Sequence, residues 1–274
     1  MTSQQPSRVG SGFDELRTAT ALRHIALIGI AGVMAGLLVG GIGGRIFMRL
    51  SAMIAPERAV GAFTEAGAVV GEITFGGTVA FILFIGISAG ALGAVIYAIS
   101  EPWLAWAGPL RGVVFGVFLV AATSIVVLDP GNFDFAILGN DPRNVLMLVV
   151  LYVAFGMVLA ALLPFLDRRL PAVDPERPID SIPGYIAMVL GGVLFLVLML
   201  ANLFVESVCE CDPPRLMGLF VIGMLLSTVA WWLSRTRESE REIKRWVMVL
   251  GYVATAGVFA AGAARAIQDI RQLL

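Results

Sequence analysis

The first long apolar stretch of the chain, IALIGIAGVMAGLLVGGIGGRIFM at residues 25–48, decides the fold class. It carries no charged residue before Arg45. A helix needs about 20 apolar residues to cross the hydrocarbon core of a bilayer, about 30 Å thick, so this stretch is long enough. Inside a bilayer, only helices and closed barrels satisfy all their backbone polar groups. The stretch therefore predicts a transmembrane helix.

Six further apolar runs follow, and the composition of the whole chain agrees with them. Hydrophobic residues make up 58% of the 274 residues and charged residues only 14%, whereas soluble domains carry roughly a quarter charged residues. We therefore predict an all-α fold, a polytopic transmembrane helix bundle of about seven spans. The predicted spans lie near residues 25–48, 77–99, 110–128, 145–166, 184–204, 216–234 and 246–264. An alternative with six spans leaves the last run at the membrane interface.

The distribution of arginine and lysine predicts the orientation. With the amino terminus in the cytoplasm, the inner segments hold twelve basic residues and the outer segments seven, which follows the positive-inside rule. The strongest signal is RTRESEREIKR at 235–245, with five basic residues. The first apolar run is too long for the core of a cleavable signal peptide. We expect a multi-pass protein of the inner (plasma) membrane of a bacterium, with a cytoplasmic amino terminus.

A proline-rich stretch divides the chain into two halves. PAVDPERPIDSIP at 171–183 has four prolines in thirteen residues and cannot be helical throughout. We read it as a cytoplasmic linker between a four-helix transmembrane half at 21–170 and a three-helix transmembrane half at 184–274. Residues 1–20 form a polar cytoplasmic segment in this interpretation.

Small residues recur at every fourth position in the first two spans. Positions four apart lie on one helix face, and bare glycine faces allow helix backbones to approach closely in membranes. We predict that spans one and two cross along these faces, although the same groove would also serve a homodimer. The predicted packing residues are Gly32, Gly36, Gly40 and Gly44 in the first span and Gly86 and Gly90 in the second.

Four charged residues near the outer end of span one form the candidate functional cluster. Arg45 and Arg49 lie one helical turn apart in GGRIFMRL, and Glu65 and Glu72 precede span two in AFTEAGAVVGEITFGGT. Charges near the membrane usually pair or line water, so one hypothesis places the four at an outward vestibule. The alternative is that they lie at the interface with their charged ends in the headgroup region. The segment 56–76 is predicted as an outer loop with one interfacial helix, or as a re-entrant helix.

Several classes of chemistry have little support. His24 is the only histidine, which excludes a bis-histidine haem within one chain and disfavours a histidine-dependent triad. Cys209 and Cys211 are too few for a zinc site, and no nucleotide-binding motif or basic stripe for nucleic acid occurs. We therefore assign no catalytic, cofactor or metal residues and expect no cofactor.

Three stretches carry a resemblance. GGRIFMR, TEAGAVVGEITFGG and DPGNFDFAIL resemble segments of uncharacterised multi-pass membrane proteins of high-GC bacteria, over roughly the first 165 residues. The resemblance implies a helical membrane architecture and brings no assigned activity.

Three functions stay open. The first is an accessory or scaffold subunit of a membrane complex, in contact with the lipid bilayer and with a membrane-protein partner or a second copy of the chain. The second is a small-solute channel or transporter with the Arg/Glu vestibule, and the third a histidine-independent lipid-modifying enzyme. We expect a non-enzyme. Convergence of the charged residues on one cavity would favour the second and third functions over the first.

Overall fold

The computed structural model describes residues 8–63, 69–127, 137–138, 141–178, 180, 182–190, 215–236 and 245–273. Within these ranges the chain is helical, apart from turns and one isolated antiparallel bridge between Phe63 and Val69. The all-α prediction is therefore confirmed for the described part of the chain.

The helices follow the predicted apolar runs closely. Thr74 caps the start of the second long helix, where its hydroxyl accepts a hydrogen bond from the Gly77 amide at 3.1 Å. Asp141 caps the helix that starts at Pro142, a residue whose fixed backbone suits the first turn. The long helices are α1 (Arg8–Ala35), α2 (Gly44–Ile54), α3 (Phe75–Ser100), α4 (Arg111–Val127), α6 (Pro142–Asp167), α8 (Arg215–Thr236) and α9 (Arg245–Leu273). The short ones are η1 (Gly36–Gly43), η2 (Glu57–Ala59), η3 (Glu101–Trp103) and η4 (Ala105–Leu110).

Five helical segments are long and apolar enough to cross a membrane, which is compatible with a membrane protein. They are Glu15–Ile54, Phe75–Trp103, Ala105–Thr123, Pro142–Asp167 and Arg245–Gln272. The last of these is long enough to cross fully. The sixth predicted run corresponds to a shorter apolar helix, Gly218–Ser234. Most of the run at 184–204 lies outside the described residues, so seven spans and the cytoplasmic amino terminus stay predictions.

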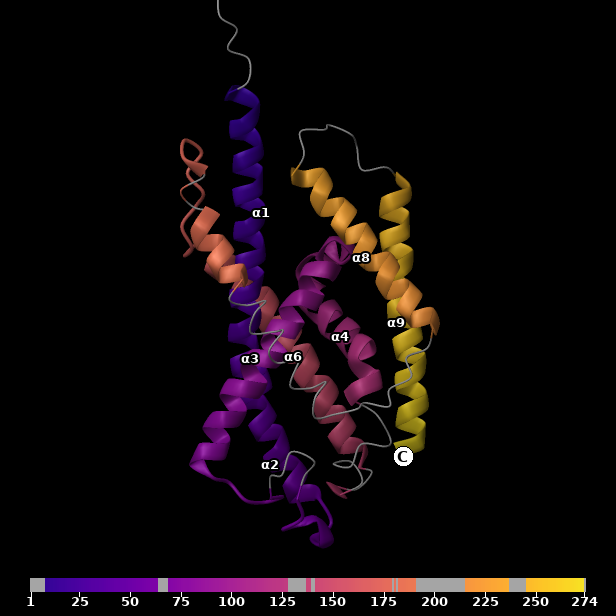
Figure 1. The fold of residues 1–274 in the computed structure, drawn as a ribbon. Helices are drawn as coiled ribbons and strands as arrows, with labels where there is room; N and C mark the ends of the chain where they lie inside the picture. The colour runs from indigo at the N-terminus through magenta and orange to yellow at the C-terminus, as the bar shows by residue number, and fades with distance from the viewer. Residues whose placement is uncertain are drawn as a thin grey trace, which may run out of the picture.

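The described helices form one bundle with two distinct ends (Figure 1). α1, η1 and α2 form one continuous rod, and α3 returns beside it. One end, called here the Arg45 end, contains α2 and the starts of α3 and α6. The opposite end, called the His24 end, contains the connection from α3 to α4 and the end of α6. In the segment 56–76, the described residues before α3 form turns, the single turn of η2 and the bridge to Val69, without a longer helix.

Glycines hold the rod against α3. A methyl group placed on Gly32 would lie 2.7 Å from the Gly90 carbonyl oxygen, and one placed on Gly86 would lie 3.1 Å from the Gly36 carbonyl oxygen. Only hydrogen at these positions permits such an approach. By contrast, the Gly40 and Gly44 positions meet side chains, those of Ala89 and Phe81.

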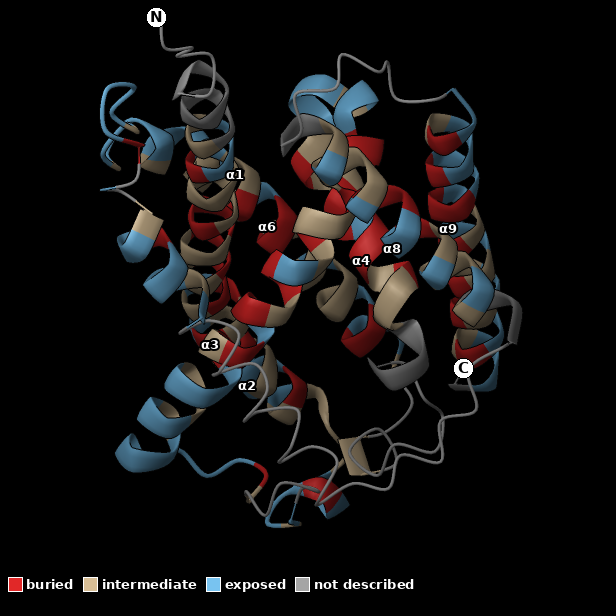
Figure 2. Cartoon of the chain, turned by 45° about the horizontal axis from the view of Figure 1, so that its top comes forward, coloured by how far each residue is buried: buried red, intermediate tan, exposed pale blue. Residues whose placement is uncertain are grey.

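The remaining helices pack in the same manner, with buried faces turned toward one another (Figure 2). Gly156 of α6 lies against the backbone of α4 at Gly116. On the other side of the bundle, the Trp103 ring covers Gly251 of α9, and its indole N–H donates to the Thr228 hydroxyl of α8 at 2.9 Å. The largest core cluster therefore runs from α1 through α3, α4 and α6 to α9.

Candidate ligand cavity

A cavity of about 1180 Å³ lies along the bundle and includes Arg45 in its lining. The rod contributes residues of η1 and α2, and α3, α4 and α6 form the other walls. On α3 the lining extends from Gly77 to Ile96, a rise of about 28 Å at 1.5 Å per residue. The cavity is thus an elongated cleft along the bundle, with part of its lining exposed, such as Phe84 at 66%.

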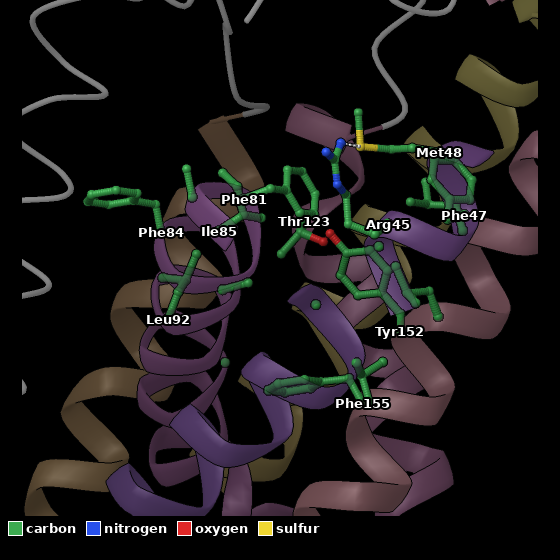
Figure 3. A pocket seen from close by; sticks show the side chains of 18 of the residues that line it. Arg45, Phe47, Met48, Phe81, Phe84, Ile85, Leu92, Thr123, Tyr152 and Phe155 are labelled. Carbon is green, nitrogen blue, oxygen red and sulfur yellow. Dashed lines mark hydrogen bonds between the residues drawn. The ribbon is translucent and has the colours of Figure 1, made fainter. Parts of the chain in front are cut away.

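The body of the cleft is apolar. In Figure 3 the α3 side chains Phe84, Ile85 and Leu92 lie on one side, and Tyr152 and Phe155 of α6 lie on the other. Ordinary ligand pockets are also lined mainly by hydrophobic and aromatic side chains, with a few polar groups that fix orientation. The polar groups of this cavity therefore decide which ligand it accepts.

Arg45 is the principal charged group of the lining. Its guanidinium donates to the Thr78 hydroxyl at 2.8 Å and to the Met48 sulfur at 3.9 Å, and it lies 5.4 Å from the Phe81 ring centroid. Among the described residues, Arg45 makes no ion pair within 4.0 Å. A guanidinium has five N–H donors, so Arg45 retains donors for an anion. The Arg45 side chain reaches into the mouth of the cleft (Figure 3).

The structure brings two members of the predicted charged cluster to this cavity. Arg45 and Glu72 both line it, whereas Arg49 is exposed and lies outside the lining. Glu65 falls outside the described residues. The pairing of arginine with glutamate therefore stays a prediction, while Arg45 and Glu72 share one mouth.

A second polar position lies deeper in the cleft. The Tyr152 hydroxyl faces the Thr123 hydroxyl (Figure 3), and the Thr123 hydroxyl donates to the Leu119 carbonyl at 2.8 Å. Both groups are neutral hydroxyls, so this position adds no charge to the walls.

Two features of the region were not predicted from the sequence. The rod contains an eight-residue π-helix, η1, at Gly36–Gly43. π-helical turns are rare and often occur at functional sites, and Val39 and Gly40 of η1 line the cavity. The glycine spacing had signalled only close packing.

The second unpredicted feature is a charged cluster at the His24 end. His24 Nε2 lies 2.8 Å from Glu101 Oε2, and the Arg111 guanidinium lies 3.6 Å from Glu101 Oε1. These residues line a separate cavity of about 370 Å³, together with Tyr97 and Asp167. The available signal was their position at the ends of three predicted spans, all on the side predicted to be cytoplasmic.

Among the described residues, no group of three or more histidine, cysteine, aspartate or glutamate side chains could hold a metal ion. Cys209 and Cys211 lie outside those residues. Comparison with family models, with curated proteins and with solved structures finds no match to this chain.

Proposed function

We propose that this chain is a multi-pass membrane protein that binds an amphiphile, a molecule with an apolar chain and an anionic headgroup, in the Arg45 cavity. The observation that supports it most directly is the position of Arg45, a cation without an ion pair among the described residues, at the mouth of an elongated apolar cleft.

Charge and shape favour this ligand class together. An anionic headgroup would satisfy the spare donors of Arg45, and charge-assisted hydrogen bonds are roughly twice as strong as neutral ones. An apolar chain would contact the walls formed by Phe81, Phe84 and Phe155. A hydrated small solute gains nothing from such walls. Glu72 at the same mouth would disfavour a headgroup with several negative charges.

The cavity also bears on the three functions predicted from sequence. Convergence of Arg45 and Glu72 on one cavity favours a ligand-binding function over a purely structural subunit. Among the ligand-binding functions, the apolar lining favours an amphiphile over a small hydrated solute. We propose the plasma membrane of a bacterium as its location, with a cytoplasmic amino terminus, so that the Arg45 end faces outward.

The test measures binding of oleate to the purified full-length chain in a neutral detergent, with oleyl alcohol as the uncharged counterpart. The wild-type chain should prefer oleate. Arg45→Gln should weaken oleate binding by about tenfold, equivalent to about 1.4 kcal/mol, and leave oleyl alcohol binding unchanged. Arg49→Gln is the matched control, because Arg49 is exposed outside the cavity.

Equal oleate affinity in the Arg45→Gln and Arg49→Gln variants would overturn the proposal. Arg45→Lys guards against misfolding, because it keeps the charge and should retain the preference for oleate. Native mass spectrometry of gently extracted protein provides an independent result. A retained amphiphile supports the proposal, whereas a stoichiometric protein partner with an empty cavity favours the subunit function.

A further inference from the structure

We infer that the Arg45 cavity and the cavity at the His24 end are the two vestibules of one translocation path, closed in this structure by a layer between them. This inference rests on the proposed function, because it takes the same amphiphile as the transported molecule. It adds an activity, the movement of the headgroup from one end of the bundle to the other.

The two cavities lie in line along the same helices. On α3 the Arg45 cavity ends at Ile96, and the His24 cavity begins at the next residue, Tyr97. On α6 the lining of the Arg45 cavity ends at Phe155, and the lining of the His24 cavity begins at Ala160. On α4 Leu119 lines the Arg45 cavity and Arg111 lines the His24 cavity. Residues of the rod also line both cavities, Leu27 at one end and Val39 at the other. The two cavities are thus stacked along the same four helical segments.

The thickness of the layer between the cavities differs from helix to helix. Four residues lie between the two linings on α6 and seven on α4, a rise of about 7–12 Å, whereas the interval from Leu27 to Val39 on the rod rises about 18 Å. Tyr97, Phe115 and Leu159 fill this layer and are at most 1% exposed, and the rings of Tyr97 and Phe115 meet edge to face at 4.9 Å. A few aromatic and aliphatic side chains therefore separate the vestibules.

The charged cluster at the His24 end connects two of the helices next to this layer and so stabilises its closed state. Glu101 contacts both His24 of α1 and Arg111 of α4, which joins the two helices through one carboxylate. Tyr97, part of the layer, lines the same cavity as Glu101 and Arg111. An anionic headgroup that bound Arg111 would compete with Glu101 beside Tyr97. Each vestibule thus has a cation for the headgroup, Arg45 at one end and Arg111 at the other.

Alternating access follows from this arrangement. In transporters, gating or rocking of helices exposes one binding region to each side in turn. The wide cavity at the Arg45 end and the small cavity at the His24 end correspond to a conformation open toward the Arg45 side. Loss of the Glu101 contacts should shift the population toward opening at the His24 end.

Cysteine accessibility in sealed vesicles of known protein orientation tests this inference on the full chain. Cys209 and Cys211 are first replaced by serine. Ala89→Cys places a thiol in the Arg45 cavity and Leu163→Cys places one in the His24 cavity. Ala254→Cys, at a position only 2% exposed, is the unreactive control. A membrane-impermeant maleimide is then added to one side at a time.

The expected result is labelling of the two thiols from opposite sides of the membrane. Oleate should slow labelling at position 89 and accelerate it at position 163. Adding Glu101→Gln should raise the labelling rate at position 163 by about tenfold, the population change expected for about 1.4 kcal/mol. Asp141→Asn removes the ion pair with Arg143, whose residues lie outside both cavity linings, and should change that rate much less.

Two results would overturn the inference. One is labelling of both thiols from the same side. The other is oleate protection at position 89 with no change at position 163, with or without Glu101→Gln, which means a binding site without a path. Because oleate binding is measured separately with Arg45→Gln, failure of the path is distinguishable from failure of the proposed function.

Discussion

The two halves of α3 have opposite surroundings. In the first half, Phe75 is 86% and Phe84 66% exposed, whereas Tyr97 and Ser100 in the second half are at most 1% exposed. The second half is fixed by the glycine contacts with the rod and by the aromatic layer. The first half leans beside the cavity and presents apolar side chains that a bilayer tolerates, since lipid tails are as apolar as leucine. The second half is therefore the anchored part of the helix, whereas the cavity lining, from Gly77 to Ile96, follows both halves.

The largest expected effect comes from breaking the anchored half. A methyl group at Gly90 would lie 2.9 Å from the Val33 backbone and meet the Gly32 carbonyl, whereas one at Gly76 would meet nothing within 4 Å. We expect Gly90→Ala to lower the free energy of unfolding by about 1–3 kcal/mol, the usual cost of overpacking. The control Gly76→Ala should be neutral or gain up to about 1 kcal/mol, because alanine favours helix. Denaturant unfolding in detergent measures both.

Similar stabilities for the Gly90→Ala and Gly76→Ala variants would show that the two halves of α3 are held alike. The regular spacing of small residues in the first two spans would then reflect the amino-acid composition of membrane helices and not a contact between these two helices.

A smaller effect is expected where α3 continues into η3. The Trp103 indole donates to Thr228, and the Thr228 hydroxyl in turn donates to the Ile99 carbonyl at 2.7 Å. Trp103→Phe keeps most of the ring and removes the donor, so we expect a loss of about 1 kcal/mol, typical of one hydrogen bond. Trp106→Phe is the control, because Trp106 is 69% exposed. Thermal unfolding should therefore show a larger loss of stability for Trp103→Phe than for Trp106→Phe. A larger loss for Trp106→Phe would contradict the anchoring of this end of α3.

The sequence predicted the ends of these helices well. The apolar run at 77–99 became α3 at Phe75–Ser100, and the run at 145–166 became α6 at Pro142–Asp167. Charged residues, prolines and capping residues interrupt hydrophobic runs at the same places where helices end, so local signals suffice. Closely spaced small residues also predicted which faces would be able to approach, because only glycine and alanine leave room for a second backbone.

The cavity and the charged cluster at the His24 end were harder to predict. The volume beside α3 depends on how far its first half leans from α6, which no local pattern encodes. Arg45 was nevertheless identifiable, because a cation at that end departs from the positive-inside rule if the amino terminus is cytoplasmic, as predicted. His24, Glu101 and Arg111 each look like an ordinary interfacial charge when taken separately. Only their approach in space, across 77 residues of sequence for His24 and Glu101, reveals a cluster.

The smallest effect is expected at the exposed start of α6, on the Arg45 side. Asp141 accepts hydrogen bonds from the Arg143 backbone amide at 2.8 Å and from its guanidinium, and these bonds lower the pKa of Asp141 to about 2. Because folding lowers the pKa of Asp141, its contribution to stability is complete at a pH above the pKa of this carboxyl in the unfolded chain, near 4. It is lost as the pH falls through about 2.

The midpoint temperature of thermal unfolding should therefore fall as the pH is lowered from about 4 to about 2. The fall should be small, because it comes from a single carboxylate. Asp141→Asn should remove that part of the pH dependence while keeping a side-chain oxygen that caps the helix. The variant and the wild-type chain should then converge at the acid end, where the native carboxyl is protonated. A variant that stays less stable than the wild type below pH 2 would show that Asp141 stabilises the start of α6 through packing rather than charge.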